Sequence, residues 1–247
     1  MSKKSLRASK ACDQMRLLVI DLPETNPERN LQIEDELNGI NNHYFIVRFW
    51  VNSRCVILGK FQKHIYEINS NFLKKNAIEY FYRNTGGGTV YQDEGNLNIT
   101  FAKPLNVELP KAKGRKTSQV ITECIRRSIE KEGLQFTVSE RNAIYYNEKK
   151  MLGSAVSMTK GKFLYHASLL VNANLENLHN SLNWQPAYPE TDKKLVKSHR
   201  DPVINLSAIY PVTIGKVKQY FLNEIIEFIQ PQQTIHINKW DELKDFI

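Results

Sequence analysis

The amino-acid sequence predicts an α+β protein in which mixed and antiparallel β-sheets are flanked by helices. The chain has 247 residues, which is enough to bury a substantial core. Short runs of β-branched and aromatic residues recur along it, separated by turn residues. Residues 117–132 carry apolar side chains at the spacing of an amphipathic helix. Because the sequence contains no repeat and no linker, we expect one domain at residues 17–247, preceded by a flexible basic tail at residues 1–16.

The N-terminal third of the chain is expected to alternate strands with short helices. Asn30 is the candidate N-cap of the first helix, which has apolar residues at positions 31, 33 and 37. The turn Asn52-Ser53-Arg54 lies between two apolar runs and therefore predicts a β-hairpin. The expected elements are a strand at 17–22, a helix at 31–37, paired strands at 44–51 and 55–58, a helix at 65–75 and a strand at 78–82.

Three consecutive glycines dominate the next stretch, residues 82–101, with the sequence YRNTGGGTVYQDEGNLNITF. Glycine has no Cβ atom, so it can adopt positive φ and let a ligand approach the backbone N–H groups. Arg83 and Thr85 precede the glycines, and a guanidinium, a hydroxyl and N–H donors are expected to converge there on one anion. The alternative is a flexible turn. The stretch lacks the spacing of a nucleoside-triphosphate loop or a dinucleotide fingerprint. Segments 89–92 and 97–101 are expected to form a second hairpin.

The C-terminal half is expected to combine a run of strands with further helices. Cys124 lies on the apolar stripe of the helix at 117–132, so we expect a core residue rather than a nucleophile. The loop at 185–202 is rich in Pro, Asp and Lys and is long enough to act as a lid. The expected elements are a helix at 117–132, strands at 136–138, 143–147, 150–158 and 163–172, helices at 175–182 and 213–229, a strand at 234–237 and a final turn at 240–246.

Two further segments carry candidate binding residues. In KKMLGSA, residues 149–155, Gly153 and Ala155 are small enough to let a ligand lie against the strand. One lysine of the pair is expected to point inward, and the alternative is two surface lysines at a hairpin turn. The segment YHASLLVN, residues 165–172, is an apolar strand that begins near His166, a residue that can bind a ligand or be purely structural.

Composition limits the cellular context and the chemistry. The three cysteines, Cys12, Cys55 and Cys124, are far apart and odd in number, which argues against a disulfide framework and against a zinc site. No apolar run approaches the roughly 18 residues of a membrane span, and the N-terminus lacks a signal-peptide core, so we expect a cytoplasmic protein. The net charge of +8 is concentrated in residues 1–16 and 103–116. These segments are either solvated or steer an acidic partner.

The glycine, lysine and histidine segments occur in one order along the chain: RxTGGGxVYxDxGNLNxxF, then RN followed by KKxxGSA, then HxSLLVNxxL. In this order they resemble the lipoate-protein ligase family of the biotin and lipoate protein ligase superfamily. The resemblance extends over residues 30–211, from NLQIEDEL to HRDPVINLSAIYP. It implies the catalytic-domain fold of that superfamily, in a short form without the small C-terminal accessory domain of the larger ligases.

The resemblance also implies a two-step reaction that uses ATP and Mg²⁺. Lipoate and MgATP give lipoyl-adenylate and pyrophosphate, and the lipoyl group then passes to a lysine of an acceptor protein. Lys150 matches the family's essential lysine, which stabilises charge on the carboxyl and α-phosphate oxygens. The other implied lipoate-binding or adenylate-binding residues are Arg83, Thr85, Gly86, Gly87, Gly88, Val90, Tyr91, Gln92, Asn96, Asn142, Gly153, Ser154, Ala155, His166 and Ser168. ATP would carry the Mg²⁺, and no metal-ligand set from the protein is expected.

The partner that the resemblance implies is an acceptor lipoyl-domain protein: a 2-oxoacid dehydrogenase E2 subunit, a glycine-cleavage H protein or a specialised lipoate-binding protein. A separate polypeptide with the accessory domain is a second expected partner, whereas nucleic acid and membranes are not expected partners. The chain departs from the family at Gln92, Ala143 and Ala167, where His, Asp and Gly are usual. Two alternatives remain: an octanoyl or lipoyl transferase that works without ATP, and a non-catalytic lipoate-binding module.

Overall fold

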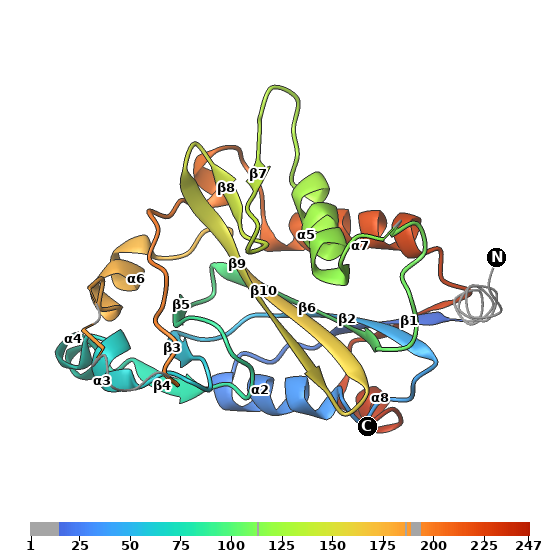
Figure 1. Ribbon diagram of the computed structural model, residues 1–247, viewed down its shortest axis with the longest axis horizontal. Coiled ribbons are helices and arrows are strands. Elements are labelled where there is room, and N and C mark those ends of the chain that lie inside the picture. The colour runs from blue at the N-terminus through green and yellow to red at the C-terminus, as the bar shows by residue number, and fades with distance from the viewer. Residues whose placement is uncertain (1–14, 113, 186, 189–193) are drawn as a thin grey trace.

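The computed structural model describes residues 15–247, except residue 113, residue 186 and residues 189–193 (Figure 1). The expected basic tail at 1–16 therefore lies outside the described residues, apart from its last two. Arg16 already belongs to the first strand, one residue earlier than predicted. Within the described part of the chain, no helix is both long enough and apolar enough to cross a membrane.

An eight-stranded sheet runs through the centre of the molecule, in the order β11-β1-β2-β6-β10-β9-β8-β7 (Figure 1). Its strands are β1 (Arg16–Asp21), β2 (Tyr44–Trp50), β6 (Asn96–Pro104), β7 (Thr137–Val138), β8 (Ile144–Tyr146), β9 (Lys149–Thr159), β10 (Lys162–Leu170) and β11 (Thr234–Ile237). Strand β1 runs parallel to β2 and β11, and the other neighbouring pairs are antiparallel. This mixed sheet, flanked by helices, confirms the α+β class.

A three-stranded sheet lies beside one end of the large sheet, in the order β4-β3-β5 (Figure 1). Its strands are β3 (Cys55–Leu58), β4 (Glu79–Tyr82) and β5 (Val90–Gln92). The two hairpins predicted from the sequence are therefore wrong, although their strands exist. Strand β2 has both edges occupied, by β1 and β6, so β3 cannot pair with it. Strand β5 pairs with β3, while β6 pairs with β2 and β10.

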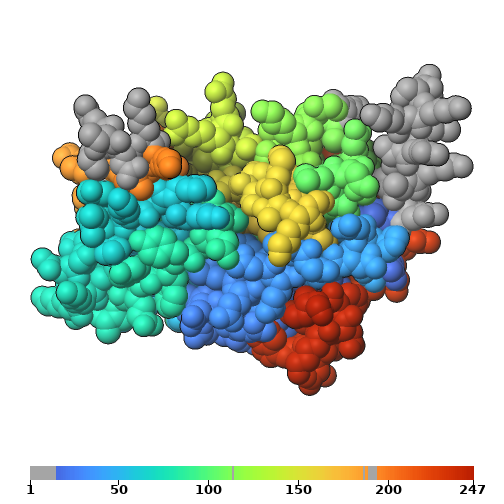
Figure 2. Space-filling model, turned by 60° about the horizontal axis from the view of Figure 1, so that its bottom comes forward, coloured from blue at the N-terminus to red at the C-terminus, as the bar shows by residue number. Residues whose placement is uncertain are grey.

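Helices cover both faces of the large sheet (Figure 1). Helices α5 (Thr117–Ser128) and α7 (Ile214–Ile229) pack over one face, and helices α2 (Pro27–Glu36) and α8 (Trp240–Lys244) cover the other. Figure 2 shows α2 beside the C-terminal segment, where the Arg29 guanidinium lies 4.8 Å from the centre of the Trp240 ring. Helices α3 (His64–Glu67), α4 (Ser70–Lys75) and α6 (Leu175–Ser181) lie with the small sheet, and a 3₁₀ turn spans Leu206–Ala208.

Helix α2 begins earlier than predicted, because Asn26 rather than Asn30 is its N-cap. The Asn26 side chain accepts a hydrogen bond from the Arg29 N–H at 2.9 Å, and Pro27 occupies the first helical position. Asn30 is fully buried, and its amide donates to the Asn52 side chain at 2.9 Å. Asn30 therefore ties α2 to the end of β2 instead of capping the helix.

Two other predicted helices are shorter than expected. The segment 65–75 forms two helices, α3 and α4, because Asn69 interrupts it. The Asn69 side chain accepts from the Phe72 N–H at 3.2 Å and so begins α4 as an N-cap. Helix α5 ends at Ser128, four residues before the predicted end.

The burial of Cys124 and of Lys103 bears on two expectations: that Cys124 is a core residue, and that residues 103–116 form a basic segment. Cys124 is buried on the apolar face of α5, as predicted, and both Cys55 and Cys124 are free thiols. Lys103 was counted in the basic segment 103–116, but it is buried, and its ammonium donates to the carbonyls of Pro104 and Val107. Lys103 therefore adds no charge to the outer surface of that segment.

Candidate active site

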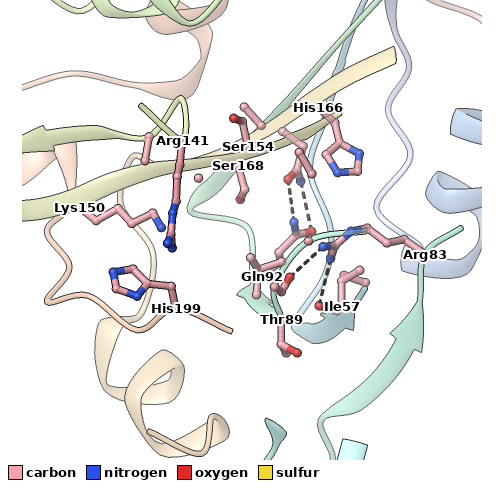
Figure 3. A pocket seen from close by; sticks show the side chains of 18 of the residues that line it. Ile57, Arg83, Thr89, Gln92, Arg141, Lys150, Ser154, His166, Ser168 and His199 are labelled. Carbon is pink, nitrogen blue, oxygen red and sulfur yellow. Dashed lines mark hydrogen bonds between the residues drawn. The ribbon is translucent and has the colours of Figure 1, made fainter. Parts of the chain in front are cut away.

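A cavity of about 310 Å³ lies where the two sheets meet (Figure 3). Its walls come from the glycine stretch before β5, from strands β9 and β10, and from the segment 194–201. The predicted site residues on its wall are Arg83, Gly87, Gly88, Val90, Gln92, Lys150, Gly153, Ser154, Ala155, His166 and Ser168. Segments that are far apart in the sequence therefore surround one cavity.

A second, more apolar cavity of about 110 Å³ adjoins the first and shares Val90, Lys150 and Gly153 with it. The predicted site residues Tyr91 and Asn96 line this second cavity. Thr85, Gly86 and Asn142 line neither cavity, but each contacts a residue that does. The hydrogen bonds are Thr85 Oγ1 to His166 Nε2 at 3.3 Å, Arg83 Nη2 to the Gly86 carbonyl at 2.8 Å, and Ser154 Oγ to the Asn142 carbonyl at 2.8 Å.

The glycine stretch requires glycine at position 87 for steric reasons. Gly87 has a φ of +96°, and a Cβ atom there would lie 2.8 Å from Arg83 Nη2 and 3.1 Å from the Ala155 Cβ. Gly59, at the end of β3, has an equally tight environment, because a Cβ atom there would lie 2.2 Å from the Gly87 carbonyl oxygen. The glycine loop is therefore held between β3 and β9.

The Arg83 guanidinium, which the sequence predicts as an anion-binding group, bonds to carbonyl groups of the glycine loop. It donates to the Gly86 carbonyl at 2.8 and 3.1 Å and to the Gly88 carbonyl at 2.8 Å. A longer bond of 3.5 Å reaches the Ile57 carbonyl (Figure 3). Burial lowers the pKa of Arg83 to about 10. The N–H groups of residues 86–88 donate to no acceptor among the described residues. Gly87 and Gly88 line the cavity, so their N–H groups remain available to a ligand.

His166 on β10 belongs to a buried polar chain. Its Nδ1 atom lies 2.9 Å from Glu34 Oε2, and the other oxygen of Glu34 accepts from Thr100 Oγ1 at 2.7 Å. Burial by itself raises the pKa of Glu34, but His166, Thr100 and Arg48 more than offset this, and the net pKa is about 2. An ionised carboxylate can only accept, so Nδ1 of His166 carries a proton, and Nε2 faces Thr85.

Lys150 lies at the boundary of the two cavities, at the start of β9. Its ammonium pairs with Asp201 Oδ2 at 3.2 Å, and its aliphatic chain passes over Gly153, where a Cβ atom would lie 3.4 Å from Lys150 Cε. The Tyr145 hydroxyl donates to the same Asp201 oxygen at 3.3 Å. The neighbouring Lys149 is exposed, so one lysine of the pair points inward, as the alternation along a strand predicts.

Residues 194–202 of the predicted lid lie beside the glycine loop and are attached to it by hydrogen bonds. Ser198 Oγ accepts from the Thr89 N–H at 2.9 Å and from Gln62 Nε2 at 2.8 Å. The Arg200 guanidinium pairs with the fully buried Glu67 carboxylate at 2.6 Å and donates to the Thr89 carbonyl at 3.0 Å. These contacts hold the segment against α3 and β5.

The three positions that depart from the family lie in or beside the cavity. Gln92 is buried and hydrogen-bonded to Asn52 at 2.6 Å and to Asn98 at 2.7 Å. Ala143 and Ala167 are buried on the cavity wall. The preceding Asn142 has a φ of +56°, and its Oδ1 atom is buried with no partner among the described residues.

Several residues of the site were not predicted as site residues. Glu34, Gly59 and Gln62 precede the glycine stretch; Glu34 lies in NLQIEDEL, and no local pattern marks Gly59 or Gln62. Arg141, Lys197, His199 and Asp201 also belong to the site. Arg141 precedes Asn142 in the motif RN, and His199 and Asp201 lie in HRDPVINLSAIYP, so the motifs already contained these residues but assigned no role to them.

Comparison with known proteins agrees with this geometry. Residues 26–226 match the family model of the lipoyl protein ligase A/B catalytic domain. Lipoate--protein ligase 1 of Staphylococcus aureus is 30% identical over 206 residues, which cover 81% of this chain. The chain spans only 60% of the length of that relative.

Two solved structures share the fold over nearly the whole chain. One is a bi-partite lipoate protein ligase from Thermoplasma acidophilum, studied with its E2 lipoyl domain, with a TM-score of 0.72 and 26% identity over 93% of this chain and 89% of that chain. The other is a lipoate-protein ligase A bound with ATP, with a TM-score of 0.72 and 26% identity over 93% and 92% of the two chains. The chain therefore belongs to the lipoyl protein ligase A/B catalytic-domain family.

Proposed function

We propose that this chain is an ATP-dependent lipoate-protein ligase, which activates lipoate as lipoyl-adenylate and transfers the lipoyl group to a lysine of an acceptor lipoyl domain. The main support is the geometry around Lys150. Lys150 lines both cavities, and Gly87 and Gly88, whose N–H groups donate to no acceptor among the described residues, line the first of them. The names of the relatives and the ATP in one of them agree with this proposal.

In the first step, a carboxylate oxygen of lipoate attacks the α-phosphorus of ATP and pyrophosphate leaves. Negative charge gathers on the α-phosphate and carboxyl oxygens, and fixed donors in a cavity stabilise such charge without having to reorganise. Lys150 supplies a positive charge, and the glycine loop, whose Gly86 and Gly88 carbonyls are held by Arg83, supplies N–H groups. The Mg²⁺ is proposed to arrive with ATP.

A cysteine-dependent acyl transferase is less well supported. Neither cavity is lined by a cysteine among the described residues. Burial raises the pKa of Cys55 above its usual value and that of Cys124 to about 12, so both thiols stay protonated and poorly nucleophilic. The available donors and cations favour adenylate chemistry, which needs no protein nucleophile.

The acceptor proposed here is a lipoyl domain, as for the Thermoplasma acidophilum ligase. That ligase is described as bi-partite, and we propose by analogy that a second polypeptide raises the rate of lipoate activation by this chain. Full-rate pyrophosphate release by the purified chain alone would contradict this part of the proposal.

The decisive experiment measures the intact mass of an apo lipoyl domain after incubation with the protein, lipoate and MgATP. We expect the mass of one lipoyl group to be added, and we expect Lys150→Ala to lower the rate by at least about 10²-fold through lost charge stabilisation. Lys149→Ala is the matched control, because Lys149 is exposed and should leave the rate unchanged. Synthetic lipoyl-adenylate in place of lipoate and ATP separates a defect in activation from a defect in transfer. Normal turnover by Lys150→Ala would refute the assigned role.

A further inference from the structure

His199 and Asp201 form a hydrogen-bonded pair on the outer side of the cavity. Nε2 of His199 lies 3.1 Å from Asp201 Oδ1, while the other oxygen of Asp201 pairs with Lys150. The His199 side chain is 62% exposed, yet it lines both cavities together with Lys150 (Figure 3). His199 is therefore open to solvent on one side and to the reaction site on the other.

The residues on both sides of His199 are anchored to the buried structure. Ser198 is held by the Thr89 N–H and Gln62, and Arg200 is held by the buried Glu67 carboxylate. Asp201 in turn fixes one ring nitrogen of His199. A solvated surface histidine needs no such support, whereas a catalytic side chain has to be held in place by its neighbours.

The transfer step requires a group that takes a proton from the acceptor lysine. A lysine side chain has a reference pKa of about 10.4, so near neutral pH the acceptor arrives as an ammonium without a lone pair for attack. The ammonium has to lose a proton before its nitrogen can bond to the lipoyl carbonyl carbon. An imidazole oriented by a carboxylate is a frequent general base, and in His199 the Nδ1 atom is the one not facing Asp201.

We propose that His199 is the general base of the transfer step and that Asp201 orients it; this inference rests on the proposed ligase function. Nδ1 takes one proton from the acceptor ε-ammonium, and the freed amine attacks the carbonyl carbon of lipoyl-adenylate. A C–N bond forms, the C–O bond to the phosphate breaks, and AMP leaves with the bonding electron pair. The second proton on the nitrogen passes to solvent, and the exposed His199 then returns its own proton to solvent.

Charged groups from several elements face this pair. Asp201 contacts His199, and three cations line the same cavity: Lys150 from β9, Arg141 from the loop before β8 and Lys197 from the same segment as His199. Tyr145 on β8 donates to Asp201, and Arg200 points to Glu67. Because Asp201 contacts both Lys150 and His199, its replacement is expected to affect both reaction steps, whereas replacement of His199 affects transfer alone.

The test separates the two steps with His199→Gln, which keeps a polar side chain of similar size but cannot act as a base. Transfer to the apo lipoyl domain is started from synthetic lipoyl-adenylate, and we expect a loss of about 10²- to 10⁴-fold near neutral pH. The loss should shrink as the pH rises and the acceptor lysine deprotonates by itself. Hydroxylamine is neutral at such pH and needs no base, so the variant should form lipoyl hydroxamate from the adenylate at the wild-type rate. His43→Ala, at an exposed turn, is the matched control.

Each other outcome has a definite meaning. An equal loss with lysine and with hydroxylamine, or a loss that does not change with pH, would show that His199 is only structural and would overturn the inference. An unchanged rate of lysine transfer would overturn it as well. Failure of the wild-type chain to modify the acceptor from the adenylate would refute the proposed ligase function and, with it, this inference, before any variant is compared.

Discussion

At the scale of single residues, Gly59 is the least obvious requirement of the site. The side chain of Gly59→Ala would place a Cβ atom 2.2 Å from the Gly87 carbonyl oxygen, so the glycine loop has to move. We expect a loss of roughly 1–3 kcal/mol in the free energy of unfolding and a weaker affinity for lipoate. Urea unfolding and calorimetric titration with lipoate measure the two effects. Gly215→Ala is the control, because its Cβ atom would meet nothing closer than 4.0 Å. Unchanged lipoate affinity in Gly59→Ala would mean that the loop is not part of the lipoate site.

Glu34 gives the protein a stability that depends on pH. Its pKa in the folded protein, about 2, lies below the ordinary value of 4.5, so its contribution to stability is fully present above pH 4.5 and is lost as the pH falls toward 2. We expect Glu34→Gln to be less stable than the wild type by on the order of a few kcal/mol near neutral pH. The difference should narrow below about pH 4 as Glu34 becomes protonated in the unfolded chain. Urea titrations of both proteins from neutral to acid pH measure this, and a constant difference would contradict the lowered pKa of Glu34.

At the scale of elements, one buried ion pair, between Arg200 and Glu67, helps to hold the segment 194–202 in place. In Arg200→Met the Glu67 carboxylate would remain buried without its cation, and we expect a loss of about 3–5 kcal/mol in the free energy of unfolding. Adding Glu67→Gln removes the buried charge and should recover part of the loss. Lys244→Met breaks only an exposed pair with Asp241 and should change little. Equal losses in Arg200→Met and the double variant would show that the ion pair is not the cause.

The strands were largely predictable from the sequence, but their partners were not. Val, Ile, Phe and Tyr runs mark β2 and β3 locally, and the turn between them is short. Pairing depends on which strand occupies each edge, and β1 and β6 occupy both edges of β2. Likewise, Asn26 and Asn30 are equally good caps by composition, and only the burial of Asn30 against Asn52 decides between them. Non-local contacts of this kind leave no local pattern.

At the scale of the whole molecule, the site shows the same difference between local patterns, which the sequence reveals, and non-local contacts, which it does not. The glycine, lysine and histidine segments could be found because each is a short motif, and the fold brings them to one cavity. The hydrogen-bond partners of Arg83 could not be predicted from the sequence, because they are backbone carbonyls that only the folded loop brings to its guanidinium. Glu34 and Asp201 could not be paired with His166 and Lys150 before the sheet placed β10 and β9 beside them. Sequence motifs thus identified the strands that line the cavity, and the structure identified the carboxylates that contact His166 and Lys150.

The net charge of the whole chain, +8, predicts how the acceptor is recruited. If an acidic lipoyl domain is attracted by this charge, the kcat/KM for the acceptor should fall steeply between about 10 mM and about 1 M salt, where the Debye length shrinks from about 30 Å to about 3 Å. The rate of hydroxamate formation from lipoyl-adenylate should change much less, because hydroxylamine is uncharged and needs no steering. Intact-mass kinetics with both nucleophiles over a salt series measure the difference. Equal salt dependence of the two reactions would place the charge effect at the adenylate site, and no salt dependence would remove any role of the basic surface in acceptor encounter.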